Sequence, residues 1–257
     1  MPQTITFFKE PHSQAATLWQ HDLQLSFQPL ASALATEEPS LPAAWNAFRA
    51  HLPTMVVLWL VVIMLSGIGF ALSHICQMVL GGIFGPSVSA DDVKTLIQLL
   101  SQLPQMPFAL ASSLVYVLFF SVPAQYYDRA EVITPEQAFS SLLNAPLRYL
   151  LAGVLFNLAL TIGFLFCLVP GLLIGFIMPI YVHRIFLTNQ PILDAFSSSF
   201  QTVFRSANGR SFIATQIYVG LMVFLASICT CGLGALVAVP MSGFYLQNAA
   251  YHKGLLR

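Results

Sequence analysis

Charged side chains are scarce in this sequence, and their scarcity excludes the commonest class of protein. Asp, Glu, Lys and Arg make up only 8% of the 257 residues, while hydrophobic residues make up 57%. An ordinary soluble domain has roughly 25% charged residues. Because so few charges could not cover the surface of a soluble protein of this length, the composition indicates a protein whose outer surface meets lipid.

An excess of positive charge is also lacking. Ten Lys and Arg balance ten Asp and Glu, so the formal net charge is zero. Proteins that bind nucleic acid usually carry a basic arm or patch, and the sequence has neither of these nor a nucleic-acid-binding motif. We expect membrane lipids as partners, together with a membrane-protein partner or a second copy of the chain, and no nucleic acid.

Catalytic motifs are missing as well. The sequence has no Gly-x-Ser-x-Gly, no His-Glu-x-x-His, no phosphate-binding glycine loop and no cluster of acids within an apolar run. The Cys-Thr-Cys sequence at 229–231 has no His or acid nearby, so it is a weak metal signal. We therefore predict no enzymatic activity, no cofactor and no metal site.

Long apolar runs are what the sequence does contain. A membrane-spanning helix needs about 20 apolar residues, and the longest run, about 54–80, lies in a stretch without charge between His51 and Asp91. Gly81, Gly82, Gly85 and Pro86 are expected to break the helix after this first span. The sequence predicts an all-α polytopic membrane protein with about six spanning helices and short amphipathic helices at the membrane interface. The later spans are predicted at about 108–126, 149–169, from the Pro170-Gly171 turn to about 187, 212–230, and a sixth that ends near 251.

The chain is predicted to divide near residue 42. Residues 1–42 form a polar N-terminal extension in which Trp19, Leu23 and Phe27 recur at steps of four, a spacing typical of one helical face. This segment is either an amphipathic helix on the membrane surface or a partly ordered tail that packs on its own domain. The rest is a membrane domain, 43–257, with hairpins at about 43–126, 135–187 and 191–251.

Basic residues predict the orientation of the chain. With six spans, eight Lys and Arg residues near span ends fall on one side of the membrane and only Lys94 falls on the other. Because such residues concentrate on the cytoplasmic side, we expect a multi-pass protein of the cell inner membrane with both termini cytoplasmic. The eight are Arg49, Arg129, Arg148, Arg184, Arg205, Arg210, Lys253 and Arg257.

An internal repeat is suggested by two similar segments and three prolines. Ala138-Phe-Ser-Ser-Leu-Leu reappears as Ala195-Phe-Ser-Ser-Ser-Phe, and the second arm of each predicted hairpin contains one proline: Pro123, Pro179 or Pro240. Copies with two spans must relate by an axis along the membrane normal. Inverted repeats, which many secondary transporters use, need an odd number of spans, so the simplest alternating-access scheme is disfavoured.

Asn157 and Gln216 are polar residues within predicted spans. Asn157 lies near the centre of the third span, and Gln216 lies early in the fifth. Polar side chains in hydrocarbon usually hydrogen-bond to another helix, which is the simpler interpretation of both. The functional alternative is contact with a transported substrate.

Other candidate positions are ionisable residues and helix kinks. His183 and Arg184 lie at the inner end of the fourth span, where an ionisable group is a functional candidate by default, although both lie close enough to the interface to reach it. Pro123, Pro179 and Pro240 each remove one backbone hydrogen bond and kink a helix. The kinks serve either as a gate or cavity beside the freed carbonyls or as static bends that pack the hairpins together.

The four cysteines map toward the outer ends of the predicted spans. A disulfide could form among them if that side is oxidising, but cysteine is also a common small apolar filler. The sequence leaves both alternatives open for Cys76, Cys167, Cys229 and Cys231.

The second and third hairpins resemble a known family. The matching pattern is a Pro-Gly turn, a helix with an internal proline, and an acidic-Ala-aromatic start to a Ser-containing amphipathic helix. The residues that carry it are Pro170, Gly171, Pro179, Asp194, Ala195, Phe196, Ser198, Phe204 and Arg205. Over about 130–251 the chain resembles bacterial polytopic membrane proteins of poorly known role, whose domain also occurs as the membrane part fused to some glycerophosphodiester phosphodiesterases. Ser197 stands where a basic residue often precedes the serine. No phosphodiesterase domain is present, so the resemblance does not imply that activity.

Two functions remain after these exclusions. The first is an integral inner-membrane protein of interaction or of envelope and lipid organisation, indicated by the hairpins, the interfacial helices and the near absence of buried charge. The alternative is a transporter or channel for a lipid or small solute, indicated by the aligned prolines and Asn157.

Overall fold

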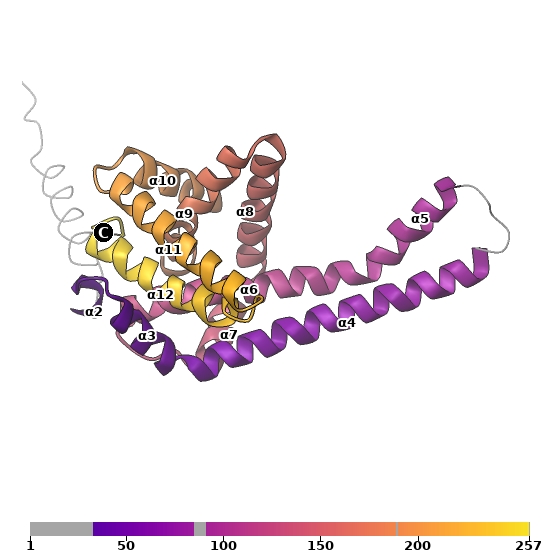
Figure 1. Ribbon diagram of the computed structural model, residues 1–257, viewed down its shortest axis with the longest axis horizontal. Helices are drawn as coiled ribbons and strands as arrows, with labels where there is room; N and C mark the ends of the chain where they lie inside the picture. The colour runs from indigo at the N-terminus through magenta and orange to yellow at the C-terminus, as the bar shows by residue number, and fades with distance from the viewer. Residues whose placement is uncertain (1–32, 85–90, 189, 257) are drawn as a thin grey trace, which may run out of the picture. The chain divides into compact units, whose positions relative to one another are not determined.

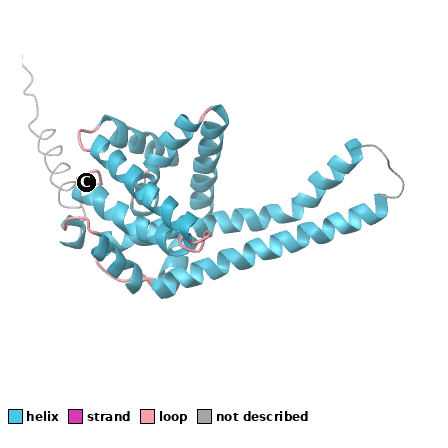
Figure 2. Cartoon of the chain, in the orientation of Figure 1, coloured by secondary structure: helices cyan, strands magenta, loops and turns pink. Residues whose placement is uncertain are grey.

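The chain is all-α over the residues that the computed structural model describes, which are 33–84, 91–188 and 190–256; Figure 1 and Figure 2 show its helices. Residues 31–257 form one packing unit. The amphipathic helix considered for the N-terminal extension falls mainly outside the described residues. The helices are α2 (Ala33–Thr36), α3 (Leu41–Ala50), α4 (Leu52–Phe84), α5 (Asp91–Gln102), η2 (Leu103–Gln105), α6 (Met106–Arg129), α7 (Pro135–Leu143), α8 (Pro146–Phe166), α9 (Leu168–Leu187), α10 (Ile192–Arg205), α11 (Gly209–Cys229) and α12 (Ala235–His252).

Five stretches of the described chain are long and apolar enough to cross a membrane. Each contains or closely overlaps one of the first five predicted spans, so the all-α, multi-pass membrane fold class is confirmed. Their many exposed large apolar side chains are expected where a helix faces lipid. The five are Leu52–Phe84, Lys94–Arg129, Pro146–Phe166, Leu168–Leu187 and Gly209–Cys229.

The sixth predicted span forms a helix, α12, but does not belong to this group of five. Its second half contains the polar residues Gln247, Asn248 and His252, and Gln247 and Asn248 are buried against protein. The end of α12 lies beside the start of α11, because Lys253 Nζ donates to Ser211 Oγ at 2.6 Å and Asn208 Nδ2 donates to the Lys253 carbonyl at 2.7 Å. α12 therefore runs back along α11, and its crossing of the membrane remains a proposal.

α4 is longer than the predicted first span. It runs without a break over Leu52–Phe84, 33 residues, or roughly 50 Å at the usual helical rise. The predicted break does not begin at Gly81 and Gly82, because both lie inside the helix, which ends at Phe84, directly before Gly85 and Pro86 in the sequence. A glycine inside a helix costs only roughly 1 kcal/mol relative to alanine, so these two glycines do not end a long helix by themselves.

The turn between α8 and α9 lies at Cys167, whose extended backbone separates the two helices. It does not lie at Pro170-Gly171, as the sequence predicts. Pro170 is accommodated in the first turn of α9, where no backbone N–H needs an acceptor. A Cβ added to Gly163 would lie 2.9 Å from the backbone N of Gly171, so the two helices come into backbone contact beside the turn.

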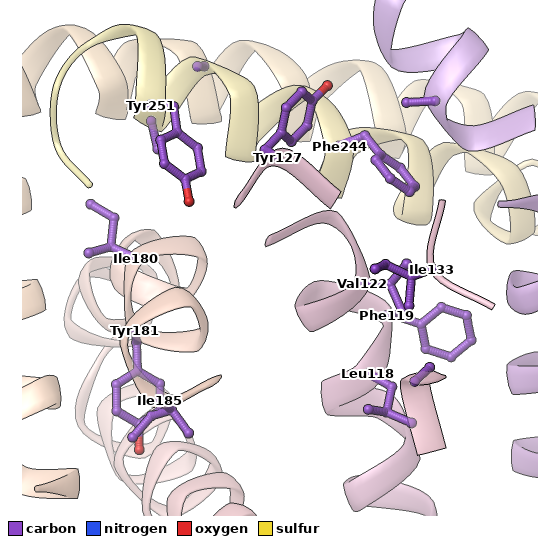
Figure 3. Close-up of a cluster of buried hydrophobic side chains, with 14 of the residues drawn as sticks. Leu118, Phe119, Val122, Tyr127, Ile133, Ile180, Tyr181, Ile185, Phe244 and Tyr251 are labelled. Carbon is purple, nitrogen blue, oxygen red and sulfur yellow. The ribbon is translucent and has the colours of Figure 1, made fainter. Parts of the chain in front are cut away.

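The second helix of each hairpin contains a proline inside it: Pro123 in α6, Pro179 in α9 and Pro240 in α12. These three helices contact one another. Short helices α3, α7 and α10 precede the first arms α4, α8 and α11. The three hairpins are therefore present, while their being copies of one unit stays a prediction. Figure 3 shows the buried side chains that α6, α9 and α12 contribute to the core, among them Phe119, Tyr127, Ile180, Phe244 and Tyr251.

Candidate functional site

Pro123 in α6 packs closely against α12. A proline at this position frees the carbonyl four residues earlier, that of Phe119. A Cβ added to Gly243 would lie 3.4 Å from Pro123 Cγ and 3.6 Å from the Phe119 carbonyl oxygen. The glycine of α12 therefore fits against the freed carbonyl, and this bend is packed rather than open.

Pro240 in α12 frees the carbonyl of Leu236 in the same way. Trp59 of α4 supplies the missing donor, because its indole Nε1 donates to the Leu236 oxygen at 3.3 Å. The pairing joins residues 177 positions apart in the chain. It ties the first hairpin to the third at the proline bend.

Gln216 in α11 bonds at the third bend. Its side-chain Nε2 donates to the Phe176 carbonyl of α9 at 2.8 Å. Pro179 leaves the carbonyl of Gly175 without its helical donor, and Phe176 is the next residue. The kink at this point makes carbonyls available to a neighbouring helix. Gln216 thus makes an interhelical hydrogen bond, the simpler of its two interpretations.

His183 and Arg184 join α9 to two other helices. The buried His183 ring lies with Nε2 2.8 Å from the Tyr251 hydroxyl of α12, and Arg184 Nη2 donates to Thr202 Oγ1 of α10 at 2.8 Å. Within the described part of the chain, His183 Nδ1 and Arg184 Nη1 are buried without a hydrogen-bond partner. Buried polar atoms without partners are uncommon in native proteins, so water is expected beside both.

A groove lies between the first and second hairpins. It has a volume of about 440 Å³ and is lined by residues of α4, α6, α8 and α9. Most of these side chains are apolar. The polar groups on its walls are those of Ser66, Ser112, Ser113, Tyr116, Asn157 and Tyr181.

Asn157 is an exposed residue that lines this groove, midway along α8. Unlike Gln216, its amide has no hydrogen-bond partner among the described residues. Leaving an amide unpaired in an apolar medium costs roughly 2–7 kcal/mol, depending on the reference solvent. A polar group that entered the groove would therefore bind to Asn157.

The hydroxyl groups on the α6 wall were not identified from the sequence. Ser112 Oγ lies 3.5 Å from Ser66 Oγ of α4, and Ser113 bonds to its own helix. The spacing of Ala109, Ser112, Ser113 and Tyr116 puts small or polar side chains at i, i+3, i+4 and i+7, which is one face of a helix. That spacing was the signal available in the sequence.

The candidate positions are thus dispersed. Asn157 lines the groove, and the part of α9 around Pro179 forms part of its wall through Met178, Tyr181 and Val182. The other candidates lie away from the groove lining: Pro123, His183, Arg184, Gln216 and Pro240.

Thiols and metal ligands are not gathered at this site. The four cysteines are free, with Cys167, Cys229 and Cys231 exposed and Cys76 half-buried. No group of His, Cys, Asp and Glu within the described ranges is placed to hold a metal ion.

Comparisons of the chain with models of protein families, with curated proteins and with solved structures find no match.

Proposed function

We propose that this multi-pass membrane protein holds a lipid or another apolar molecule of the bilayer in the groove between its first two hairpins. Its role is then one of lipid organisation or interaction, without catalysis. The single observation that supports this is the groove itself. Its volume of about 440 Å³ is within the usual range for ligand pockets, roughly 300–1,000 Å³.

The walls of the groove favour a ligand drawn from the membrane. All four wall helices lie within the stretches that are long and apolar enough to span a bilayer. A groove between such helices opens toward hydrocarbon, where acyl chains and other apolar molecules are the available ligands. No acidic or basic side chain lines it, so the part of the ligand that enters is uncharged.

Copurification tests this proposal. The protein is purified in mild detergent and its bound lipids are measured by native mass spectrometry. Ala109→Phe puts a bulky ring into the groove from α6 and should reduce the bound lipid severalfold. Ala71→Phe is the matched control, because Ala71 is an exposed residue of α4 outside the groove lining. Equal lipid content in wild type and both variants would remove the proposal.

Transport of a lipid or small solute is the second candidate. The observation that favours it is that the groove wall includes the part of α9 just after Pro179, so movement at that bend would change the groove. Liposomes containing the protein should then move a fluorescent lipid between leaflets faster than empty liposomes, and Ala109→Phe should abolish the difference. If the protein retains lipid but does not move it between leaflets, transport is excluded and lipid holding is the remaining role.

Six crossings with both termini in the cytoplasm are part of the proposal. The hydrogen bonds that hold the end of α12 beside the start of α11 support the sixth crossing. Cys229 ends α11 and Cys231 lies in the turn that follows, so both should react with a membrane-impermeant maleimide added to intact cells. A tag at residue 257 should stay protected. Labelling of the tag on intact cells would contradict this orientation.

The resemblance of residues 130–251 to bacterial polytopic membrane proteins supports an assignment to the bacterial inner membrane. It does not imply phosphodiesterase activity. We also propose that the protein binds another membrane protein or a second copy of the same chain. Crosslinking in native membranes followed by mass measurement tests it, and recovery of uncrosslinked monomer alone would count against both.

A further inference from the structure

We propose that the molecule held in the groove carries a hydroxyl or carbonyl group partway along its apolar chain, and that this oxygen hydrogen-bonds to Asn157. This inference rests on the proposed function, that the groove binds an apolar molecule. It goes further by naming the chemical class that the site recognises, an amphiphile with an uncharged oxygen partway along its chain, away from its head group.

The depth of Asn157 in the protein is the first reason. Asn157 lies near the middle of α8, Pro146–Phe166, so the rise of the helix puts it roughly 15 Å from either end. The polar head group of an ordinary lipid stays at the membrane surface. The groups of such a lipid that reach Asn157 are methylenes, which neither donate nor accept a hydrogen bond.

The absence of a protein partner is the second reason. Asn157 makes no hydrogen bond to any described residue, whereas Gln216, another amide within a span, bonds across helices. Polar side chains within spans normally find such a partner. Asn157 instead lines the groove, where a bound molecule is the remaining source of one.

The surrounding groups match a neutral oxygen rather than a charge. The groove lining also offers the Ser66 and Ser112 hydroxyls, 3.5 Å apart, and the Tyr116 phenol. An amide and hydroxyl groups can each donate or accept a hydrogen bond, so together they can bind either a hydroxyl or a carbonyl.

Binding of matched probes tests the inference. The probes are stearate, stearate with a mid-chain hydroxyl, and stearate with a mid-chain keto group. Each is titrated into the full-length protein in nanodiscs, and affinity is measured by competition with a fluorescent fatty acid. Wild type should prefer the oxygenated probes over stearate by about tenfold, the value of one added hydrogen bond.

Two variants separate recognition of the oxygen from recognition of the chain. Asn157→Leu should remove the preference, so that the three probes bind the variant with equal affinity. Thr161→Val is the matched control, because Thr161 is an exposed polar residue of α8 outside the groove lining, and it should keep the preference. The infrared carbonyl stretch of the keto probe gives a reading without any variant at position 157. Its frequency should be lower in wild type than in Ala109→Phe, where the groove is filled.

The outcomes distinguish this inference from the proposed function. Equal affinity of wild type for all three probes, with Ala109→Phe weakening every one, would overturn the inference and leave the groove as a site for plain chains. A preference that survives Asn157→Leu would also overturn it. Failure of every probe to bind wild type, or binding that Ala109→Phe does not change, would overturn the proposed function itself.

Discussion

The His51 imidazole accepts, at Nε2, a hydrogen bond of 3.1 Å from the backbone N–H of Ile133. Its other nitrogen, Nδ1, lies 2.8 Å from the Ala47 carbonyl, so the bonding pattern assigns the proton of the neutral ring to Nδ1. Thr54 Oγ1 donates to the Ile133 carbonyl at 2.8 Å. The start of α4 therefore binds both backbone groups of one residue in the connection between α6 and α7.

Loss of the His51 acceptor should destabilise the protein. His51→Phe keeps a ring against Tyr126 and Phe244, whose centroids lie 4.9 and 5.0 Å away, but it leaves the buried Ile133 N–H without a partner. We expect a loss of about 1–3 kcal/mol in the free energy of unfolding, measured by denaturant titration in detergent. The control is His74→Phe, because His74 is exposed on α4 and should be nearly neutral. Equal effects of the two substitutions would contradict the structural role of His51.

The same histidine should make stability depend on pH. His51 lies between α3 and α4, outside the spanning helices, and burial lowers its pKa from 6.5, opposed in part by the hydrogen bond to Ala47. Because the unfolded chain then binds more protons than the folded protein, its contribution to stability is complete above pH 6.5 and is lost as the pH falls from 6.5 toward the folded pKa. The melting temperature of wild type should therefore fall more steeply than that of His51→Phe between about pH 7 and about pH 5. Parallel curves would show that His51 does not titrate in this way.

Trp59 and Pro240 should be energetically coupled. In wild type the Trp59 indole donates to the Leu236 carbonyl, which the proline leaves without its helical donor. Trp59→Phe should therefore cost about 0.5–1.5 kcal/mol of hydrogen-bond free energy, in addition to lost packing. Pro240→Ala restores a backbone N–H at position 240, so in that background the hydrogen-bond part of the cost should disappear.

A double-mutant cycle measures the coupling between Trp59 and Pro240. Unfolding free energies are determined for wild type, both single variants and the double variant, and the interaction term isolates the hydrogen bond from the packing. Tyr116→Phe serves as a control partner, because Tyr116 contacts the Trp59 ring at 6.3 Å and should show no coupling to Pro240. Additive effects of Trp59→Phe and Pro240→Ala would contradict the pairing.

Much of the fold could be predicted from sequence because lipid imposes a simple length rule. Hydrocarbon forces every spanning segment to satisfy its own backbone hydrogen bonds over about 20 residues, so apolar runs identify the spanning helices directly. The same approach underestimated the length of α4. Gly81 and Gly82 were expected to break the helix, but it continues through them to Phe84. The approach also treated α12 as an ordinary span, although Gln247 and Asn248 there are buried by protein rather than exposed to lipid.

The long-range contacts could not be predicted in this way. His51 and Ile133 are 82 positions apart, and nothing in the local pattern around either residue indicates the other. Likewise, Asn157 and Gln216 look alike in sequence, as single amides in apolar runs. Only their neighbours distinguish them, because Gln216 meets a carbonyl beside a proline bend whereas Asn157 meets a groove.

Two glycines of the α8–α9 hairpin should respond in opposite ways to the same substitution. A Cβ on Gly163 would lie 2.9 Å from the backbone N and 3.0 Å from the Cα of Gly171, and backbone cannot move aside as a flexible side chain can. Gly163→Ala should therefore cost about 1–3 kcal/mol through overpacking. Gly175 in α9 has nothing within 4 Å of its Cβ position, so Gly175→Ala should be neutral or stabilise the helix by up to about 1 kcal/mol. Denaturant titration in detergent measures both, with Gly220→Ala, at another open helical position, as a further control. If Gly163→Ala were as stable as Gly175→Ala, the backbones of α8 and α9 could not approach as closely as the structure shows.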